Sequence, residues 1–107
     1  LANVAGVELP LEPADAYSKR WLTTVLFNPA QFGRTNDGVR LAFGKENIET
    51  RPLWKPMHLQ PVFRDVPRYE NGISETLFAR GLCLPSGSNL SGEAKAFILN
   101  VFQQLIG

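Results

Sequence analysis

The sequence predicts an α/β domain of the two-layer α+β kind, in which helices pack on a small sheet of about three strands. Three observations support this prediction. Residues 21–27 (WLTTVLF) are dense in β-branched and aromatic residues, residues 82–84 (LCL) form a second apolar run, and residues 92–106 place apolar side chains at helical spacing. At 107 residues, the chain has the length of one domain.

The first predicted strand spans residues 21–27 and is expected to be buried on both faces. It should end at Asn28, because the proline that follows cannot donate a backbone hydrogen bond. We expect residues 30–35 to form a loop. A helix should begin near Thr35 or Asn36, since the side chain of either residue can cap it.

The middle of the chain is predicted to be largely irregular. Lys45 lies near the end of the first helix, where a cation suits the helix dipole, and Asn47 can adopt a left-handed turn. Residues 48–51 would then form a second short strand. Prolines interrupt residues 52–72, for which we expect at most one helical turn, around residues 57–60.

The last third of the chain alternates helix, strand and helix. Ser74 is expected to cap a short helix over residues 75–80, and Gly81 to end it in the left-handed conformation. Residues 82–84 form a buried strand, and Ser91 caps the final helix. One face of that helix carries its apolar side chains, namely Phe97, Ile98, Val101, Phe102, Leu105 and Ile106.

The composition is that of an ordinary folded domain, with 44% hydrophobic and 20% charged residues. A net charge of +1 gives no reason to expect a nucleic-acid partner. The basic charge is concentrated between residues 51 and 68, where four basic side chains face one acidic one, a local excess of +3. No stretch approaches the length of a membrane span, and no signal peptide is evident. The first residue is leucine, which suggests a fragment of a longer polypeptide.

No complete catalytic set is present: the sequence lacks a G-x-S-x-G nucleophile elbow, a P-loop and a G-x-G-x-x-G turn. The single cysteine, Cys83, excludes an internal disulfide and suits a reducing cytosol, so we expect a cytoplasmic protein. We interpret Cys83 as a buried thiol rather than half of a Cys–His pair, and Ser86 as structural because no base is placed to activate it. No three metal ligands cluster in the sequence, and no metal site is predicted.

The most unusual segment is RPLWKPMHLQP, residues 51–61, which we call the proline loop. Its three prolines fix their own φ angles and favour extended neighbours, so its side chains are held with little freedom to lose. Trp54 offers a flat apolar face, while Arg51, Lys55 and His58 offer polar groups suited to a phosphate. This combination fits an anionic ligand with a ring. The alternative is a loop that covers a core edge, with His58 structural and its apolar residues used in packing.

Two motifs resemble a known family. The runs NIETRPLWKPMHLQPVF (residues 47–63) and NGISETLFARGLCLPSGSNLS (residues 71–91) are similar to the C-terminal part of the DegT/DnrJ/EryC1/StrS sugar aminotransferases. These enzymes depend on pyridoxal phosphate. The resemblance includes RWLTT at residues 20–24 and so covers residues 18–106.

The resemblance implies the small C-terminal domain of a fold-type I aminotransferase over residues 16–107, with residues 1–15 as the connector from a missing large domain. In such enzymes the large domain carries the Schiff-base lysine, the aspartate facing the pyridine nitrogen and the phosphate-binding residues. None of these has a match here, so Lys55 is not given that role. No catalytic or cofactor-binding residue is predicted, and the fragment alone should be inactive and bind no pyridoxal phosphate.

The resemblance further implies a reaction that converts a 4-keto nucleotide sugar to a 4-amino sugar for glycan, capsule or lipopolysaccharide synthesis. Expected partners are the nucleotide sugar, an amino donor such as glutamate, and a second copy in a homodimer. Residues 54–61 match the W-K-P-x-H-x-Q-P motif, and the resemblance implies substrate contacts at Trp54, Lys55, His58 and Gln60, together with Arg51 just before the motif. Two alternatives remain: a stand-alone anion-binding module without catalysis, and a regulatory or assembly domain.

Overall fold

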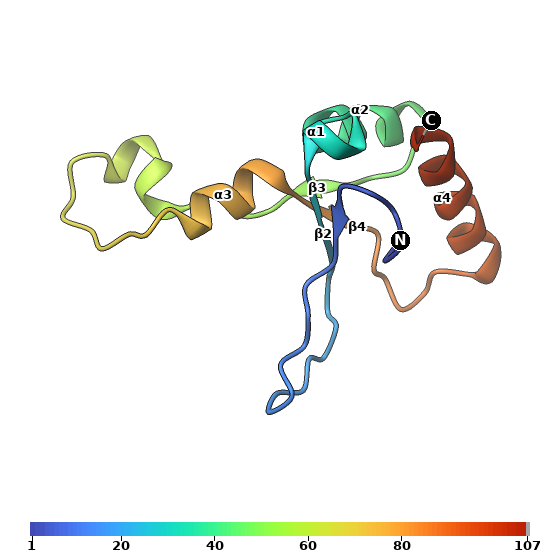
Figure 1. The fold of residues 1–107 in the computed structure, drawn as a ribbon, viewed down its shortest axis with the longest axis horizontal. Coiled ribbons are helices and arrows are strands. Elements are labelled where there is room, and N and C mark those ends of the chain that lie inside the picture. The colour runs from blue at the N-terminus through green and yellow to red at the C-terminus, as the bar shows by residue number, and fades with distance from the viewer. Residues whose placement is uncertain (107) are drawn as a thin grey trace.

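A four-stranded antiparallel sheet forms the centre of the structure, a computed structural model that describes residues 1–106 (Figure 1). Its spatial order is β1 (Val7–Glu8), β2 (Thr23–Phe27), β4 (Gly81–Leu84) and β3 (Arg51–Pro52). The small sheet with helices on it confirms the predicted fold class. The edge strand β1 was not predicted, because it lies in the segment interpreted as a connector.

The described residues also form four α-helices and two 3₁₀ turns. They are α1 (Pro29–Phe32), α2 (Asn36–Lys45), η1 (Met57–Leu59), η2 (Pro61–Phe63), α3 (Ile73–Arg80) and α4 (Gly92–Leu105). Helix α2 contacts α4, β3 and β4, whereas α3 contacts β2 and β4. Figure 1 shows α1, α2 and α4 gathered around one part of the molecule, while α3 leads away from it.

The core lies between the sheet and the helices α1, α2 and α4, and aromatic rings fill much of it. Phe102 of α4 is only 1% exposed. Its ring centroid lies 5.8 Å from that of Phe32 and 6.3 Å from those of Phe27 and Phe43. Because these rings come from four different elements, Phe102 joins α4 to the rest of the domain.

Three of the predicted helix and turn signals are confirmed. Thr35 caps α2, with its hydroxyl accepting a hydrogen bond from the Gly38 amide at 3.1 Å. Ser91 caps α4 in the same way, accepting from the Ala94 amide at 3.1 Å. Asn47 adopts the left-handed conformation, with φ of 58°.

The predicted start of α3 was wrong, whereas its end at Arg80 is confirmed with a different conformation at Gly81. Gly72, with φ of 77°, occupies the N-cap position in place of Ser74, and no side chain caps the helix from there. Gly81 is extended rather than left-handed, with φ of −90°. The physical reason is that Gly81 is already the first residue of β4, so the helix passes directly into the strand.

Other boundaries also differ from expectation. The first strand is shorter than predicted and not fully buried, since Trp21 lies outside it and Thr23 is exposed. The strand expected over residues 48–51 pairs only at Arg51 and Pro52. Residues 29–32 form the short helix α1 instead of a loop, because Asn28 accepts from the Ala30 amide and proline is favourable in a first turn.

Two segments project from this core (Figure 1). One is the N-terminal loop, residues 9–22, which runs between β1 and β2. The other, which we call the arm, consists of residues 53–72 and carries both 3₁₀ turns out to α3. Within residues 1–106, no helix combines the length and the apolar character needed to cross a membrane.

Candidate functional site

The proline loop begins at the sheet and ends on the arm. Arg51 and Pro52 form the edge strand β3, and the chain then leaves the sheet. Pro56 precedes the turn η1, in which the Gln60 amide donates to the Met57 carbonyl at 3.0 Å. The helical turn predicted around residues 57–60 is confirmed to within one residue.

Trp54 and Lys55 present their side chains to the exterior. Trp54 is 67% exposed, and its ring lies 6.5 Å from that of Trp21, which is 77% exposed on the N-terminal loop. Lys55 is also exposed, and it forms no ion pair within residues 1–106. The loop therefore exposes an indole ring and, at the next position in the chain, an ammonium group.

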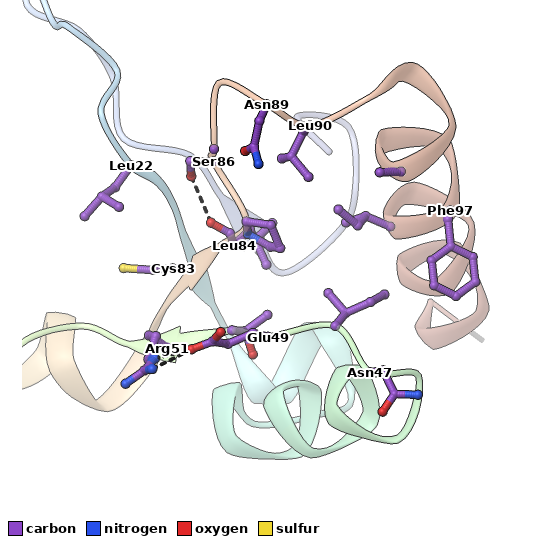
Figure 2. A pocket seen from close by; sticks show the side chains of 16 residues that line it. Leu22, Asn47, Glu49, Arg51, Cys83, Leu84, Ser86, Asn89, Leu90 and Phe97 are labelled. Carbon is purple, nitrogen blue, oxygen red and sulfur yellow. Dashed lines mark hydrogen bonds and ion pairs between the residues drawn. The ribbon is translucent and has the colours of Figure 1, made fainter.

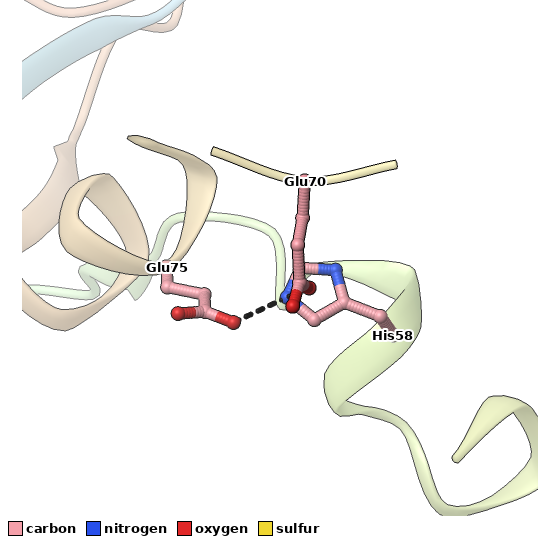
Figure 3. A group of neighbouring side chains, drawn as sticks. All are labelled: His58, Glu70 and Glu75. Carbon is pink, nitrogen blue, oxygen red and sulfur yellow. Dashed lines mark hydrogen bonds and ion pairs between the residues drawn. The ribbon is translucent and has the colours of Figure 1, made fainter. Parts of the chain in front are cut away.

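His58 lies in a different environment, because only 13% of its side chain is exposed. Its Nε2 lies 2.6 Å from a carboxylate oxygen of Glu75 on α3 and 3.3 Å from one of Glu70 on the arm (Figure 3). Glu70 is shared, since Arg68 also donates to it at 2.9 Å. Both carboxylates therefore lie against the same ring nitrogen of His58, Nε2.

Arg51 and Gln60 are engaged by near neighbours. Arg51 forms an ion pair with Glu49, two residues earlier, and both side chains are largely exposed. The side-chain amide of Gln60 donates to the Met57 sulfur at 3.5 Å. The structure thus divides the five predicted contact residues between the sheet edge (Arg51) and the arm (the other four).

A pocket of about 540 Å³ opens beside Arg51, between the sheet edge and α4 (Figure 2). Its wall is mostly apolar and includes Ile48, Leu84, Leu90, Phe97 and Ile98. Figure 2 shows Arg51 and Glu49 paired with each other at one side of this space. The sequence analysis did not predict this pocket, since its walls come from four separate segments.

Two buried side chains lie along the same pocket. Burial raises the pKa of the Cys83 thiol, which agrees with its interpretation as a buried thiol. The hydroxyl of Thr50 is buried and has no hydrogen-bond partner within residues 1–106. Such a group is costly, and it is the one buried side-chain polar atom in the described part of the chain left in this state.

Ser86 has the structural role that the sequence suggested. Its hydroxyl accepts from the Thr23 amide at 2.7 Å and donates to the Leu84 carbonyl at 2.8 Å. Both of its hydrogen-bonding functions are used to hold the end of β4 against the start of β2. No base lies against this hydroxyl within the described residues, so nothing there activates it.

Sequence reasoning missed the carboxylates that surround the predicted site. It also held that no three metal ligands cluster, yet His58, Glu70 and Glu75 bring their ligand atoms within 4.8 Å of one another. These residues are separated by 12 and 5 positions in the chain, and no regular element connects them. The one available signal was that a half-buried histidine requires a polar partner.

The fold corresponds to one part of an aminotransferase structure. The aminotransferase TlmJ from Streptoalloteichus hindustanus superposes with a TM-score of 0.83 at 19% identity, over 99% of this chain and 28% of TlmJ. At that identity the match establishes the fold alone.

The chain belongs to the DegT/DnrJ/EryC1/StrS aminotransferase family, whose model matches residues 1–103. EpsN of Bacillus subtilis (strain 168), which carries the name of a pyridoxal phosphate-dependent aminotransferase, is 38% identical over 98% of this chain. GDP-perosamine synthase of Escherichia coli O157:H7 is 30% identical over 86% of it. The chain spans about a quarter of these relatives' lengths, 27% and 24% respectively.

Pyridoxal phosphate is the cofactor of this family. The residues described here do not fit it, because a Schiff-base lysine must lie in a pocket that orients the ring and phosphate. The chain's lysines, Lys19, Lys45, Lys55 and Lys95, are all exposed. No lysine of this chain is therefore suited to hold the cofactor.

Proposed function

We propose that this chain is the small C-terminal domain of a nucleotide-sugar aminotransferase that converts a 4-keto sugar to a 4-amino sugar. Residues 16–107 would form the domain and residues 1–15 the connector from a large domain. Glutamate is the proposed amino donor, and a homodimer the proposed assembly. Family membership and the name of GDP-perosamine synthase support this proposal.

The role of this chain would be to hold the nucleotide sugar. The observation that carries the proposal is the exposed Lys55, without an ion pair in the described residues, beside the exposed Trp54 on a proline-fixed loop. An ammonium group attracts a diphosphate, and an indole face packs against a ring. We propose that Arg51, from the sheet edge, and Gln60 and His58, from the arm, make further contacts to the same substrate.

Pyridoxal phosphate, when bound by the rest of the enzyme, supplies the electron sink for transfer of the amino group. This chain contributes binding and orientation, which lower the barrier by fixing the reacting groups relative to each other. We therefore propose that the 107-residue chain alone is inactive and binds no pyridoxal phosphate. A visible absorption band from the cofactor on this chain would contradict that statement.

The test uses the longer protein that this proposal implies. Its coding sequence upstream of Leu1 should supply a large domain with the Schiff-base lysine. Lys55→Gln in that protein should raise KM for the nucleotide sugar about tenfold, the effect of losing one charge-assisted phosphate contact, and leave kcat within about threefold. Arg64→Gln is the matched control, because Arg64 is another exposed arm cation without an ion pair in residues 1–106. Equal KM values for wild type and Lys55→Gln would refute the assignment.

A stand-alone anion-binding module is the second candidate. The local basic excess of residues 51–68 favours it, since that charge is present in the isolated chain. Calorimetry of this chain with GDP separates the two candidates. Affinity in the micromolar range, about −8 kcal/mol, would support a module, whereas no detectable heat would support a site completed by the large domain.

A further inference from the structure

The cluster of His58, Glu70 and Glu75 joins the arm to α3. His58 lies on η1, Glu70 near the end of the arm, and Glu75 in the first turn of α3 (Figure 3). The sequence separations are 17 and 5 residues, so the contact closes a long excursion of the chain. The ring that forms it is mostly buried, with 13% of its side chain exposed.

The contact between His58 and Glu75 has the geometry of a hydrogen bond. The Nε2–Oε1 distance is 2.6 Å. Two ligands of one tetrahedral zinc ion, each about 2.0–2.1 Å from it, would be about 3.3 Å apart. The observed separation is shorter, and it matches a donor and an acceptor that share one hydrogen. Because an ionised carboxylate can only accept, this contact requires a hydrogen on Nε2.

The two carboxylates are unequal partners of the ring. Glu70 lies farther from Nε2, at 3.3 Å, and it also accepts from Arg68 at 2.9 Å. Glu75 forms no other side-chain ion pair within residues 1–106. The orientation of His58 therefore depends on Glu75 much more than on Glu70.

Glu75 is itself connected to the core through a short rigid path. Helix α3 ends at Arg80 and passes without a loop into β4 at Gly81. At that junction the side chain of Leu53, the first residue of the arm, lies against Gly81 so closely that a β-carbon there would meet it at 2.1 Å. The arm is thus held at its base by Leu53 and near its middle by the hydrogen bond between His58 and Glu75.

We propose that Glu75 is a positioning residue for substrate binding, acting through His58. By accepting from Nε2–H, it fixes the ring orientation and the tautomer, and it leaves Nδ1 as the nitrogen that can meet a ligand. A neutral ring then presents Nδ1 as an acceptor for a sugar hydroxyl, and a charged ring presents it as a donor for a phosphate oxygen. The ligand class rests on the proposed function, whereas the hydrogen bond does not.

The hydrogen bond is tested first without any ligand. His58 is the only histidine in the chain, so its imidazole gives a single set of ¹⁵N–¹H correlations in the 107-residue protein. We expect one tautomer, with hydrogen on Nε2. Glu75→Gln should give a mixture of tautomers, because an amide can donate as well as accept. Glu70→Gln should leave the spectrum close to that of wild type.

Three results would overturn the positioning role. One is a wild-type ring with hydrogen on Nδ1 only, and another is an unchanged tautomer in Glu75→Gln. The third is binding of added Zn²⁺ at one equivalent with loss of the Nε2–H signal. Circular dichroism checks that each variant is folded. Glu75→Asp keeps a carboxylate acceptor, so hydrogen should stay on Nε2 in this variant. This measurement tests the role of the carboxylate even if Glu75→Gln unfolds.

Kinetics of the longer protein then test the consequence for binding. Glu75→Gln should raise KM for the nucleotide sugar about tenfold, equivalent to about 1.4 kcal/mol, with kcat within about threefold. Glu70→Gln should raise KM by less than about twofold. A normal KM in Glu75→Gln with a raised KM in Lys55→Gln would overturn the positioning role and leave the proposed function intact. Normal KM in both variants would overturn the proposed function, while the tautomer result would still stand.

Discussion

Adding a single methyl group at Gly81 should disturb the packing at the base of the arm. It joins α3 to β4, and a β-carbon built there would lie 2.1 Å from Cδ1 and 2.4 Å from Cγ of Leu53. The same β-carbon would lie 2.6 Å from the Leu77 carbonyl oxygen. A leucine side chain can rotate away, whereas a helical carbonyl cannot move without shifting the backbone. Gly81→Ala should therefore force a local rearrangement at the base of the arm.

The expected loss is about 1–3 kcal/mol, the usual range for overpacking a closely filled site. For a domain whose total stability is roughly 5–15 kcal/mol, this is a substantial fraction. A loss of about 2 kcal/mol should lower Tm by about 8–16 °C. Urea denaturation followed by far-UV circular dichroism measures the free energy of unfolding directly.

Gly44→Ala is the matched control, because Gly44 lies in the last turn of α2 and a β-carbon there meets nothing within 4 Å. That variant should be as stable as wild type or more stable by up to about 1 kcal/mol. In a double-mutant cycle, adding Leu53→Ala to Gly81→Ala should recover about 1 kcal/mol by removing one of the two clashes. If Gly81→Ala matched Gly44→Ala in stability, the close packing of Leu53 against Gly81 would be refuted.

Three further predictions concern the core, the turn after β4 and the thiol. Phe102→Ala should cost about 3–5 kcal/mol by urea denaturation, whereas Phe97→Ala on the same helix, 47% exposed, should cost under about 2; equal costs would contradict the assigned core. Ser86→Ala should cost about 1–3 kcal/mol by the same assay, since it loses both of its hydrogen bonds, and a neutral result would show them to be unimportant. Burial raises the pKa of the Cys83 thiol, so alkylation at pH 8 should be at least about tenfold slower in the native protein than in urea. For the same reason, the free energy of unfolding should fall as the pH rises past the ordinary pKa of a thiol. Equal alkylation rates in the native protein and in urea would refute the burial of Cys83.

The elements predicted well from the sequence are those whose signal is local. Thr35 and Ser91 lie directly before amphipathic runs and cap their helices as expected. The run at residues 82–84 is a buried strand because it is apolar and bounded by glycine and proline. Strand β1 could not be predicted, since only two residues pair, and their partners Phe27 and Leu26 lie about 20 positions later. Its pairing depends on tertiary contacts, which local propensity does not determine.

In the candidate site too, the local features were predictable from the sequence and the long-range contacts were not. The proline loop is recognisable because its unusual side chains are contiguous, and the structure leaves Trp54 and Lys55 exposed on it. The environment of His58 was not recognisable, because it depends on how the arm folds back to Glu75. Sequence reasoning therefore identified which residues are unusual and could not assign which of them face outward. The substrate contacts themselves remain predictions.

The ion pairs in the structure indicate which basic side chain an incoming diphosphate would meet first. The sequence suggests three basic contacts, yet Glu49 pairs with Arg51, and His58 is mostly buried between carboxylates. An exposed pair such as that of Arg51 is worth only about 0–1 kcal/mol, so a diphosphate can replace Glu49 at little cost. Moving His58 would require breaking a partly buried contact, which is more expensive. Lys55 needs neither step, and so the ligand should bind Lys55 first, recruit Arg51 second and meet His58 only in the orientation that its carboxylate partner fixes.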